Sequence, residues 1–218
     1  MTQAERNKAI LKKYIPEKSV DIIAEWIYKY NFKLKIKKSR SSKIGDYTPP
    51  QEEKNHVITV NNDLNKYSFF VTLIHEIAHL ITWETYKGKV YTHGKEWKTE
   101  YSKLLNHFLT MNVSMPEQEK LFPYDIFYAL KTHMFSPSAA SCSDLHLSRV
   151  LKKYDSTIET ILLEQIAEGQ LFKIARSKTK HSSEIFIKGK KIKTRYQCFH
   201  VGTKKQFFIH ALCGVILK

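Results

Sequence analysis

The chain has 218 residues, of which 42% are apolar, so it can bury one substantial core or a core with a smaller appendage. No apolar run approaches the roughly 20 residues that cross a bilayer, and the charged N-terminal stretch lacks the apolar segment of a secretory signal. The cysteines are too few for a disulfide framework and odd in number. We therefore expect a globular, cytoplasmic protein with thiols and no membrane partner, and we leave its oligomeric state open.

Positive charge is the most unusual bulk property, because 36 Lys and Arg stand against 21 Asp and Glu, for a net charge of +15. The excess lies in two segments: residues 29–43 carry seven basic residues and no acid, and residues 173–205 carry eleven against Glu184 alone. Clustered basic side chains neutralise phosphates and release their counterions. DNA, single- or double-stranded, is therefore a predicted partner of these surfaces. The alternative is that the lysines only solubilise the protein.

The first 60 residues predict a helix followed by strands. Apolar residues recur at helical spacing over residues 17–30, which indicates an amphipathic helix. Residues 32–37 (FKLKIK) alternate strictly and predict a half-buried strand with a basic outer face. The lysines of that face are Lys33, Lys35 and Lys37. Residues 45–50 contain the glycine and prolines of a turn region, and HVITV at 56–60 predicts a second strand.

Two longer helices are predicted next. The first begins at Asn65 or Ser68, either of which can cap it, and continues to about Tyr86 with apolar residues on most sides. The second begins near Gly94 and runs through Phe108. The order of helix, strands, helix and helix predicts an α+β fold.

The C-terminal half has a different pattern. Helical periodicity covers residues 125–131 and 144–168, and the small-residue stretch 136–143 between them is the best candidate for a linker. Short alternating segments follow, with turns predicted at 188–189 and 201–203. This part of the sequence predicts a small antiparallel sheet.

One pentad, HEIAH at residues 75–79, indicates the chemistry. Residues four apart on a helix project from nearly the same face, so His75 and His79 can place two imidazole nitrogens on one ion with Glu76 beside them. On an otherwise apolar helix, two histidines and a glutamate would be costly without a ligand to bind or a network to join. The pentad therefore favours a zinc site over two histidines that are satisfied by other partners.

A catalytic zinc needs a third protein ligand and one open position. The pattern with a third histidine six residues after the second is excluded, because Thr85 stands at that position. A glutamate ligand on the following helix would be Glu96 or Glu100. We favour His93, which stands just before Gly94 at the entry of the next helix, where a side chain can point back across a groove.

The two segments together resemble a known family. HEIAH, followed fourteen residues later by HGKEWK, is similar to the SprT-like metallopeptidase domain of bacterial SprT proteins and of the DNA-dependent protease Spartan. The resemblance spans about residues 15–115 and implies that His93 is the third zinc ligand, with Trp97 as the aromatic residue of its segment. It also implies a zincin-like core, in which helices pack on a small sheet, and cleavage of proteins held on DNA.

The C-terminal region departs from that family, whose members usually carry a zinc ribbon with four cysteine or histidine ligands. The residues that could hold a second zinc are Cys198, His200, His210 and Cys213. The reading that we favour is a metal-free sheet that resembles a degenerate zinc ribbon. Its expected core residues are Phe186, Ile192, Tyr196, Phe208 and Val215.

We predict three domains from these patterns. A SprT-like zinc metallopeptidase domain is expected at residues 1–120, a helical connector at 121–168, and a small basic antiparallel β-sheet domain at 169–218.

The predicted activity is that of a zinc-dependent endopeptidase of the HExxH type, which hydrolyses protein substrates at or near nucleic acid. His75, His79 and His93 would hold Zn²⁺, and Glu76 would be the general base. A donor for the tetrahedral oxyanion is also needed, and the candidates are Tyr91, Tyr101 and His107. The alternatives are a basic nucleic-acid-binding module with a structural or vestigial zinc site, and a peptidase with no nucleic-acid partner.

Overall fold

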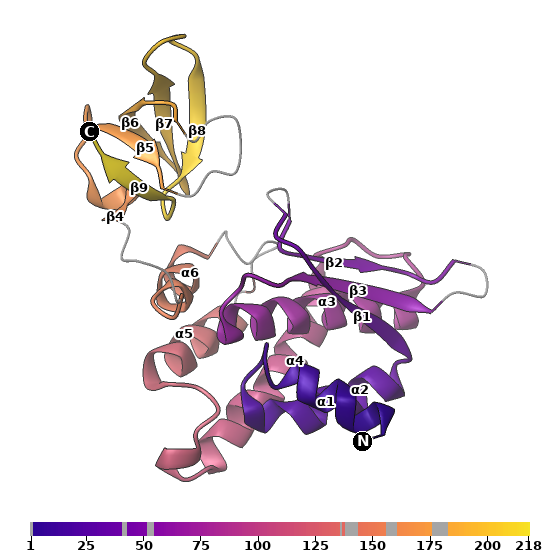
Figure 1. Cartoon of the computed structure of the whole chain (residues 1–218). Helices are drawn as coiled ribbons and strands as arrows, with labels where there is room; N and C mark the ends of the chain where they lie inside the picture. Colours follow the sequence, from indigo (N-terminus) through magenta and orange to yellow (C-terminus); the bar gives the residue numbers. More distant parts are fainter. Residues whose placement is uncertain are drawn as a thin grey trace. The chain divides into compact units, whose positions relative to one another are not determined.

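The chain forms two compact units, residues 1–155 and residues 156–218 (Figure 1). The computed structural model describes residues 2–40, 43–51, 55–135, 137, 144–155, 161–175 and 183–218. These residues contain six α-helices and two small sheets, so the fold class is α+β, as predicted. Within the described part of the chain, no helix combines the length and the apolar character that a membrane span requires.

The first unit consists of helices packed around a three-stranded sheet. Its α-helices are α1 (Gln3–Leu11), α2 (Val20–Lys29), α3 (Lys66–Tyr86), α4 (Lys95–Ser114), α5 (Tyr124–Phe135) and α6 (Leu145–Lys152). Its strands are β1 (Phe32–Lys37), β2 (Gly45–Thr48) and β3 (His56–Asn61), and short 3-10 turns lie at Glu17–Ser19 and Glu117–Glu119. The predicted helices near residues 17–30, 65–86 and 94–108 are confirmed, as are both predicted strands.

Helix α1 and strand β2 were not among the predicted elements. Helix α1 has a capping box, in which Thr2 Oγ1 accepts the N–H of Glu5 at 3.2 Å and Glu5 Oε2 accepts the N–H of Thr2 at 2.7 Å. The T-x-x-E spacing is therefore a sequence signal for this helix. Strand β2 occupies the segment that we predicted as a turn region, and its pairing with β3 is what makes it a strand.

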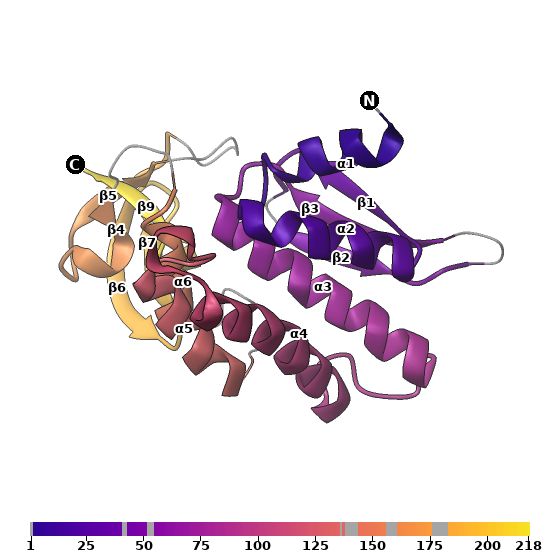
Figure 2. The same ribbon diagram turned by 90° about the horizontal axis from the view of Figure 1, so that it is seen from below.

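The sheet has the order β1-β3-β2, so β2 is an edge strand of the described sheet. Strand β1 pairs with β3 in parallel, and β2 pairs with it antiparallel, with Gly45 opposite Val60 and Tyr47 opposite Ile58. Because side chains alternate along a strand, these four residues share one face. Figures 1 and 2 show α3 running along the sheet, and contacts from Gly45 to α3 identify this face as the one that packs on it.

Helix α3 is the central element of the first unit. Asn65 is its cap, since the Asn65 side chain accepts the N–H groups of Tyr67 and Ser68 at 3.0 and 2.9 Å. The helix is buried on most sides because apolar residues recur around it, and α4 packs along its length. Lys87 follows in the left-handed conformation, with φ of 49°, and ends the helix.

Residues 121–152 pack onto the first unit. Phe122, Ile126 and Leu147 are buried in the same hydrophobic cluster as α3 and α4. The connector that we predicted at 121–168 is therefore divided between the units, because residues 161–168 belong to the second one. Of the predicted linker, residues 136–143, only Pro137 lies within the described residues.

The helix predicted over residues 144–168 is confirmed for Leu145–Lys152, where helix α6 ends. It is wrong over residues 161–168, because Ile161–Leu162 form strand β4, followed by a 3-10 turn at Leu163–Gln165. Residues 156–160 of this prediction lie outside the described residues. The apolar period of this stretch suits a helix, but Leu163 and Ile166 pack into the core of the second unit instead. Tertiary packing has overridden local propensity here.

The second unit is a six-stranded antiparallel sheet of order β4-β9-β5-β6-β7-β8, as the pattern of short strands predicts. The remaining strands are β5 (Leu171–Ile174), β6 (Phe186–Ile192), β7 (Arg195–His200), β8 (Gln206–His210) and β9 (Gly214–Leu217). Its buried core contains Leu163, Ile166, Phe172, Phe186, Cys198 and Val215. The turn predicted at 201–203 is confirmed.

The turn predicted at 188–189 is wrong, because both residues lie inside β6. The register with β7 shifts between Lys188 and Lys191, and a Cβ on Gly189 would lie 2.7 Å from the Gln197 carbonyl oxygen. Gly189 therefore lies in a β-bulge, where the backbone of β7 comes too close for a larger side chain. The chain reverses at residues 193–194 instead.

Two of the predicted core residues of this sheet are exposed. Phe186 and Val215 are buried and Tyr196 packs against the core, but Ile192 and Phe208 are 45% and 48% exposed. The register explains the difference. Phe208 lies opposite Gln197 and Ile192 opposite Arg195, on the sheet face away from Cys198.

Candidate metal centre

His75, His79 and His93 meet at one point of the first unit. The Nε2 atom of His79 lies 3.1 Å from Nε2 of His75 and 3.0 Å from Nε2 of His93, and the remaining pair is 3.2 Å apart. An ion about 2.0–2.1 Å from each nitrogen, at tetrahedral angles, would hold the nitrogens about 3.3 Å apart. Among the described residues, these histidines form the one cluster whose atoms could hold a metal ion.

Hydrogen bonding alone does not account for this arrangement. Each nitrogen of a neutral imidazole offers either one hydrogen or one lone pair, in one direction. Three converging Nε2 atoms therefore cannot satisfy all three of their short contacts with one another. A cation placed between them would accept all three lone pairs, and three imidazoles are a donor set that zinc favours.

The surroundings keep the three imidazoles neutral and able to bind a cation. Burial, followed by the charges of His79 and His93, lowers the pKa of His75 to about 3. Burial, followed by the charge of His93, lowers the pKa of His79 to about 4, and burial lowers the pKa of His93. Neutral imidazole is the form that binds metals.

The Trp97 ring packs against the three histidines of the cluster. Its ring centroid lies 4.6 Å from that of His75, 5.3 Å from His79 and 4.8 Å from His93, and its side chain is fully buried. Its indole N–H donates to the backbone oxygen of His75 at 3.4 Å, and Tyr101 stacks beneath it at 5.1 Å. The indole thus contacts all three histidines, and the aromatic residue of the HGKEW segment has a packing role.

The loop before α4 brings His93 to the cluster. Gly94 is the N-cap of α4, its N–H donates to the Tyr91 carbonyl at 2.9 Å, and a Cβ there would lie 3.1 Å from that oxygen. A compact turn therefore sets the direction of His93. Of the glutamates considered as ligands, Glu100 pairs with Lys103 at 2.8 Å, and neither Glu96 nor Glu100 belongs to the described cluster.

Glu76 is buried beside the cluster and faces β2. A Cβ on Gly45 would lie 2.6 Å from Glu76 Oε1, so the strand approaches the carboxyl closely. Burial, followed by the charge of Asp46, raises the pKa of Glu76 to about 8, against the opposing effects of Lys43, Arg40 and the N–H of Tyr47. A cation on the histidines would favour the carboxylate. The sequence analysis did not predict that a strand, β2, packs against Glu76. The signal in the sequence is Gly45, two residues before Tyr47, because a glycine allows a strand backbone to lie close to a neighbouring side chain.

The structure separates the three candidates for an oxyanion donor. Tyr101 is fully buried under Trp97, and burial raises the pKa of its phenol. His107 packs against Trp26 and Phe108, about 15 Å along α4 from Trp97 by the helical rise. Tyr91 is 88% exposed and lies two residues before His93. Of the three, Tyr91 is therefore the side chain with the freedom to reach a bound substrate.

The four residues considered for a second zinc do not converge. His210 lies opposite Arg195, on the face away from Cys198, because positions 195 and 198 of β7 point to opposite sides of the sheet. His200 Nδ1 accepts the N–H of Thr203 at 2.8 Å. Within the described part of the chain, these residues form no metal-binding group, and no disulfide joins Cys198 to Cys213.

A buried lysine lies beside Cys198 in the second sheet. Lys188 points to the same face as Cys198, and its ammonium donates to the Ile166 oxygen at 2.5 Å and to the Glu164 oxygen at 3.5 Å. It also lies 3.9 Å from the centre of the Tyr196 ring. An internal ammonium therefore binds backbone oxygens and an aromatic face in this unit.

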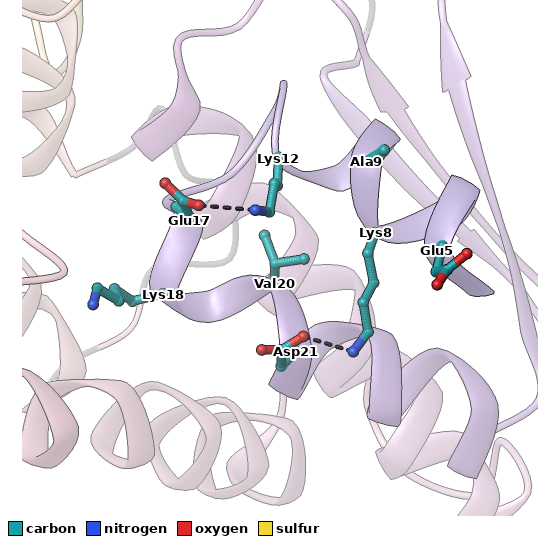
Figure 3. Close-up of a pocket in the computed structure, with 8 residues that line it drawn as sticks. All are labelled: Glu5, Lys8, Ala9, Lys12, Glu17, Lys18, Val20 and Asp21. Carbon is teal, nitrogen blue, oxygen red and sulfur yellow. Dashed lines mark hydrogen bonds and ion pairs between the residues drawn. The ribbon is translucent and has the colours of Figure 1, made fainter. Parts of the chain in front are cut away.

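A pocket of about 640 Å³ lies between α1 and α2, away from the histidine cluster (Figure 3). Its charged side chains pair across it, with Lys8 2.7 Å from Asp21 and Lys12 2.9 Å from Glu17. These pairs are exposed to solvent and add little stability. The pocket offers no histidine or cysteine, so it does not compete with the histidine cluster as a metal centre.

The fold and the cluster define a class: an α+β protein with two histidines one turn apart on a central helix, a glutamate beside them and a third histidine from the next loop. Residues 21–117 match the sequence model of the SprT-like family. This part of the chain is therefore similar to the SprT-like family, in agreement with the motifs, and that family is associated with metallopeptidase-like proteins. Neither a curated protein nor a solved structure gives a significant match to the chain.

Proposed function

We propose that the protein is a zinc-dependent endopeptidase whose first unit has a zincin-like core. The convergence of the three Nε2 atoms within 3.0–3.2 Å of one another is the observation that carries the proposal. When bound there, zinc would lower the pKa of water and polarise the scissile carbonyl. Three protein ligands leave a position open for chemistry, whereas a structural zinc is normally closed by four.

Glu76 supplies the proton transfer in this proposal. Its carboxylate accepts the proton of the water whose oxygen attacks the peptide carbon, and then delivers that proton to the amine nitrogen as the C–N bond breaks. The N–H of Tyr47 on β2 favours the ionised form of this carboxyl. Strand β2 is an edge strand of the described sheet, and it lies directly beside Glu76.

The first test is the effect of Glu76→Gln. The amide keeps the shape of the side chain but cannot accept the proton, so cleavage of an unstructured protein such as casein should fall by about 10² to 10⁴ while bound zinc is unchanged. Zinc would be measured by elemental analysis and cleavage by peptide mapping. Equal turnover by Glu76→Gln and the wild type would remove Glu76 from the mechanism.

The second test concerns the metal. The purified protein should contain about one zinc per chain, and the double variant His79→Ala, His93→Ala should contain none, because two of the three ligands are gone. Lys12→Ala, His107→Ala is a matched double variant away from the cluster and should keep its zinc. A full complement of zinc in the ligand variant would contradict the site.

The second unit supports a nucleic-acid partner, and the substrates we propose are proteins at or near nucleic acid. Residues 156–218 contain 12 Lys and Arg against 4 Glu, which is a net charge of +8. Phe186 is buried, whereas Phe199 and Phe208 are exposed on the outer face of this sheet. Exposed aromatic rings among lysines suit single strands, since bases stack on them without sequence preference.

A further inference from the structure

A chain of hydrogen bonds connects the edge strand β2 to the C-terminal end of α3. Tyr47 Oη lies 2.8 Å from His56 Nδ1, and His56 Nε2 lies 2.8 Å from Glu84 Oε1. Lys87 Nζ bonds the other oxygen of Glu84 at 2.9 Å. Tyr47 and His56 lie on the sheet face that packs on α3, and their rings stack at 5.8 Å. This series of hydrogen bonds therefore connects β2, β3 and α3.

The donor and the acceptor of each hydrogen bond in this series can be assigned from the ionisation states of Glu84 and Tyr47. The pKa of Glu84 is lowered, first by its hydrogen bond to Lys87, so Glu84 is a carboxylate and accepts a hydrogen from His56 Nε2. Burial, and then the charge of Glu84, raise the pKa of Tyr47, so the phenol keeps its hydrogen and donates it to Nδ1. The order is thus Tyr47 O–H to His56, and His56 N–H to Glu84, with no donor opposed to a donor.

His56 is held on its remaining sides as well. Its ring is 7% exposed and meets the Trp83 ring edge-on at 5.4 Å. A histidine with both nitrogens bonded and its face packed has one orientation. It can therefore act as a rigid spacer between β2 and α3.

The backbone of the same tyrosine meets the proposed base. Gly45, two residues earlier on β2, lies against Glu76 and Thr72, and the N–H of Tyr47 acts to lower the pKa of the Glu76 carboxyl. Residues 76 and 84 are two turns apart on α3, about 12 Å by the helical rise. Strand β2 therefore meets α3 at two points, through the Tyr47 side chain and His56 at one and through the backbone at Gly45 at the other.

We propose that Tyr47, His56 and Glu84 form a positioning network, which holds the edge strand β2 on α3 and so keeps Gly45 and the Tyr47 N–H beside the carboxylate of Glu76. None of the three touches the substrate in this proposal; they act through Glu76. The proposal rests on the proposed peptidase function for its effect on rate, but not for its effect on structure.

The test is Tyr47→Phe, which removes the phenol oxygen and little else. Loss of a typical hydrogen bond corresponds to about a tenfold change, so hydrogen exchange of the residue 47 amide should become about tenfold faster. The kcat for peptide cleavage, expressed per folded and zinc-loaded chain, should fall by about tenfold with KM and zinc content unchanged. Exchange would be read residue by residue by NMR.

Two further variants separate positioning from general damage. Glu84→Ala should reproduce both effects, whereas Glu84→Gln keeps an oxygen that accepts from His56 and should restore most of the wild-type behaviour. Tyr28→Phe is the matched control, because Tyr28 lies on α2 and is 90% exposed. It should change neither exchange nor kcat.

Three results would overturn the network: unchanged exchange at residue 47 in Tyr47→Phe, an equal change in Tyr28→Phe, or faster exchange with an unchanged kcat. Absence of cleavage by the wild-type, zinc-loaded protein would instead contradict the proposed peptidase. The exchange measurement would then still decide whether the three residues hold β2 on α3. The two failures are therefore distinguishable.

Discussion

Gly45 determines how closely β2 can approach the proposed base. A Cβ at this position would lie 2.5 Å from Thr72 Cγ2 and 2.6 Å from Glu76 Oε1. The Thr72 methyl cannot retreat easily, because the Thr72 hydroxyl bonds the Ser68 carbonyl at 2.8 Å within α3. Only a residue without a side chain permits the observed separation of strand and helix.

Gly45→Ala should therefore push β2 away from α3 and impair both stability and cleavage. Overpacking of this kind typically destabilises by about 1–3 kcal/mol, and the Tyr47 N–H would move away from Glu76. Urea denaturation would give the stability, and peptide cleavage the activity. Wild-type values for both would show that the strand can shift without consequence.

The companion variant is Gly45→Ala with Thr72→Ser. Serine keeps the hydroxyl that bonds Ser68 but lacks the methyl that would meet the new Cβ. The double variant should recover more of the stability than of the activity, because the contact with Glu76 persists. Thr72→Ser alone is the control.

Helix α6 shows how one short element is fixed at its first turn. Asp144 caps it by accepting the N–H of Leu147 at 3.0 Å, and its other oxygen lies 2.7 Å from Nδ1 of His133 on α5. His133 is 3% exposed and stacks edge-on against Tyr101 at 5.6 Å. The carboxylate thus joins α5 and α6 next to the aromatic residues that pack against the histidine cluster.

The pKa of Asp144 leads to a prediction about acid stability. Burial acts to raise this pKa, but the Leu147 N–H and then His133 outweigh it, so the pKa in the folded protein is below its ordinary value. The ionised form is therefore favoured by folding, and its contribution is present above an ordinary pKa of about 3.9 and lost as the pH falls through the folded value.

Asp144→Ala should lower the free energy of unfolding at pH 7 by about 1–2 kcal/mol, as for other lost helix caps. The difference from the wild type should shrink at pH 3, where the wild-type carboxylate begins to take up its proton. Asp63→Ala, at an exposed position before α3, is the control for removing a carboxylate. A difference that grows on acidification would contradict the assigned direction.

At the scale of the whole molecule, the two units differ in charge and in chemistry. The first unit contains the histidine cluster, and the second contributes +8 to the total of +15. The exposed lysines on and after β6 include Lys190, Lys191 and Lys193. If they contact phosphates, binding should depend strongly on salt and little on sequence.

Changing Lys190, Lys191 and Lys193 together to Gln should therefore weaken binding to single-stranded DNA. The log–log slope of affinity against salt should become shallower by about 2, at about 0.7 per lost phosphate contact. Fluorescence anisotropy with a labelled oligonucleotide would measure it. Zinc content should not change, because the histidine cluster proposed to hold the metal lies in the first unit.

The matched control is the triple change of Lys8, Lys12 and Lys18 to Gln. These lysines are each paired with an acidic residue at 2.7–2.9 Å, so they add little to a field that attracts phosphates. An equal loss of affinity in both triple variants would indicate a general charge effect. No binding by the wild type at low salt would leave the lysines a solubilising role.

The sequence by itself determined the features that depend on residues close together in the chain. The 3.6 period of residues 66–86 places His75 and His79 on one face of a helix, and the strict alternation of FKLKIK defines β1 to the residue. The composition likewise shows where positive charge accumulates. Neighbouring side chains have fixed relative directions once the local conformation is known, so such features can be read without a fold.

Only the tertiary structure decided which distant segments meet. Three contacts depend on how segments far apart in the sequence pack together. His93 lies beside His75 and His79 of α3, β2 packs against Glu76, and Leu163 and Ile166 pack in the core of the second unit. The register of β8 against β7 decided that Phe208 faces outward. The alternation of side chains along β8 is compatible with either Phe207 or Phe208 on the buried face. The local sequence pattern is compatible with several packing partners for each of these segments, and tertiary packing selected one of them.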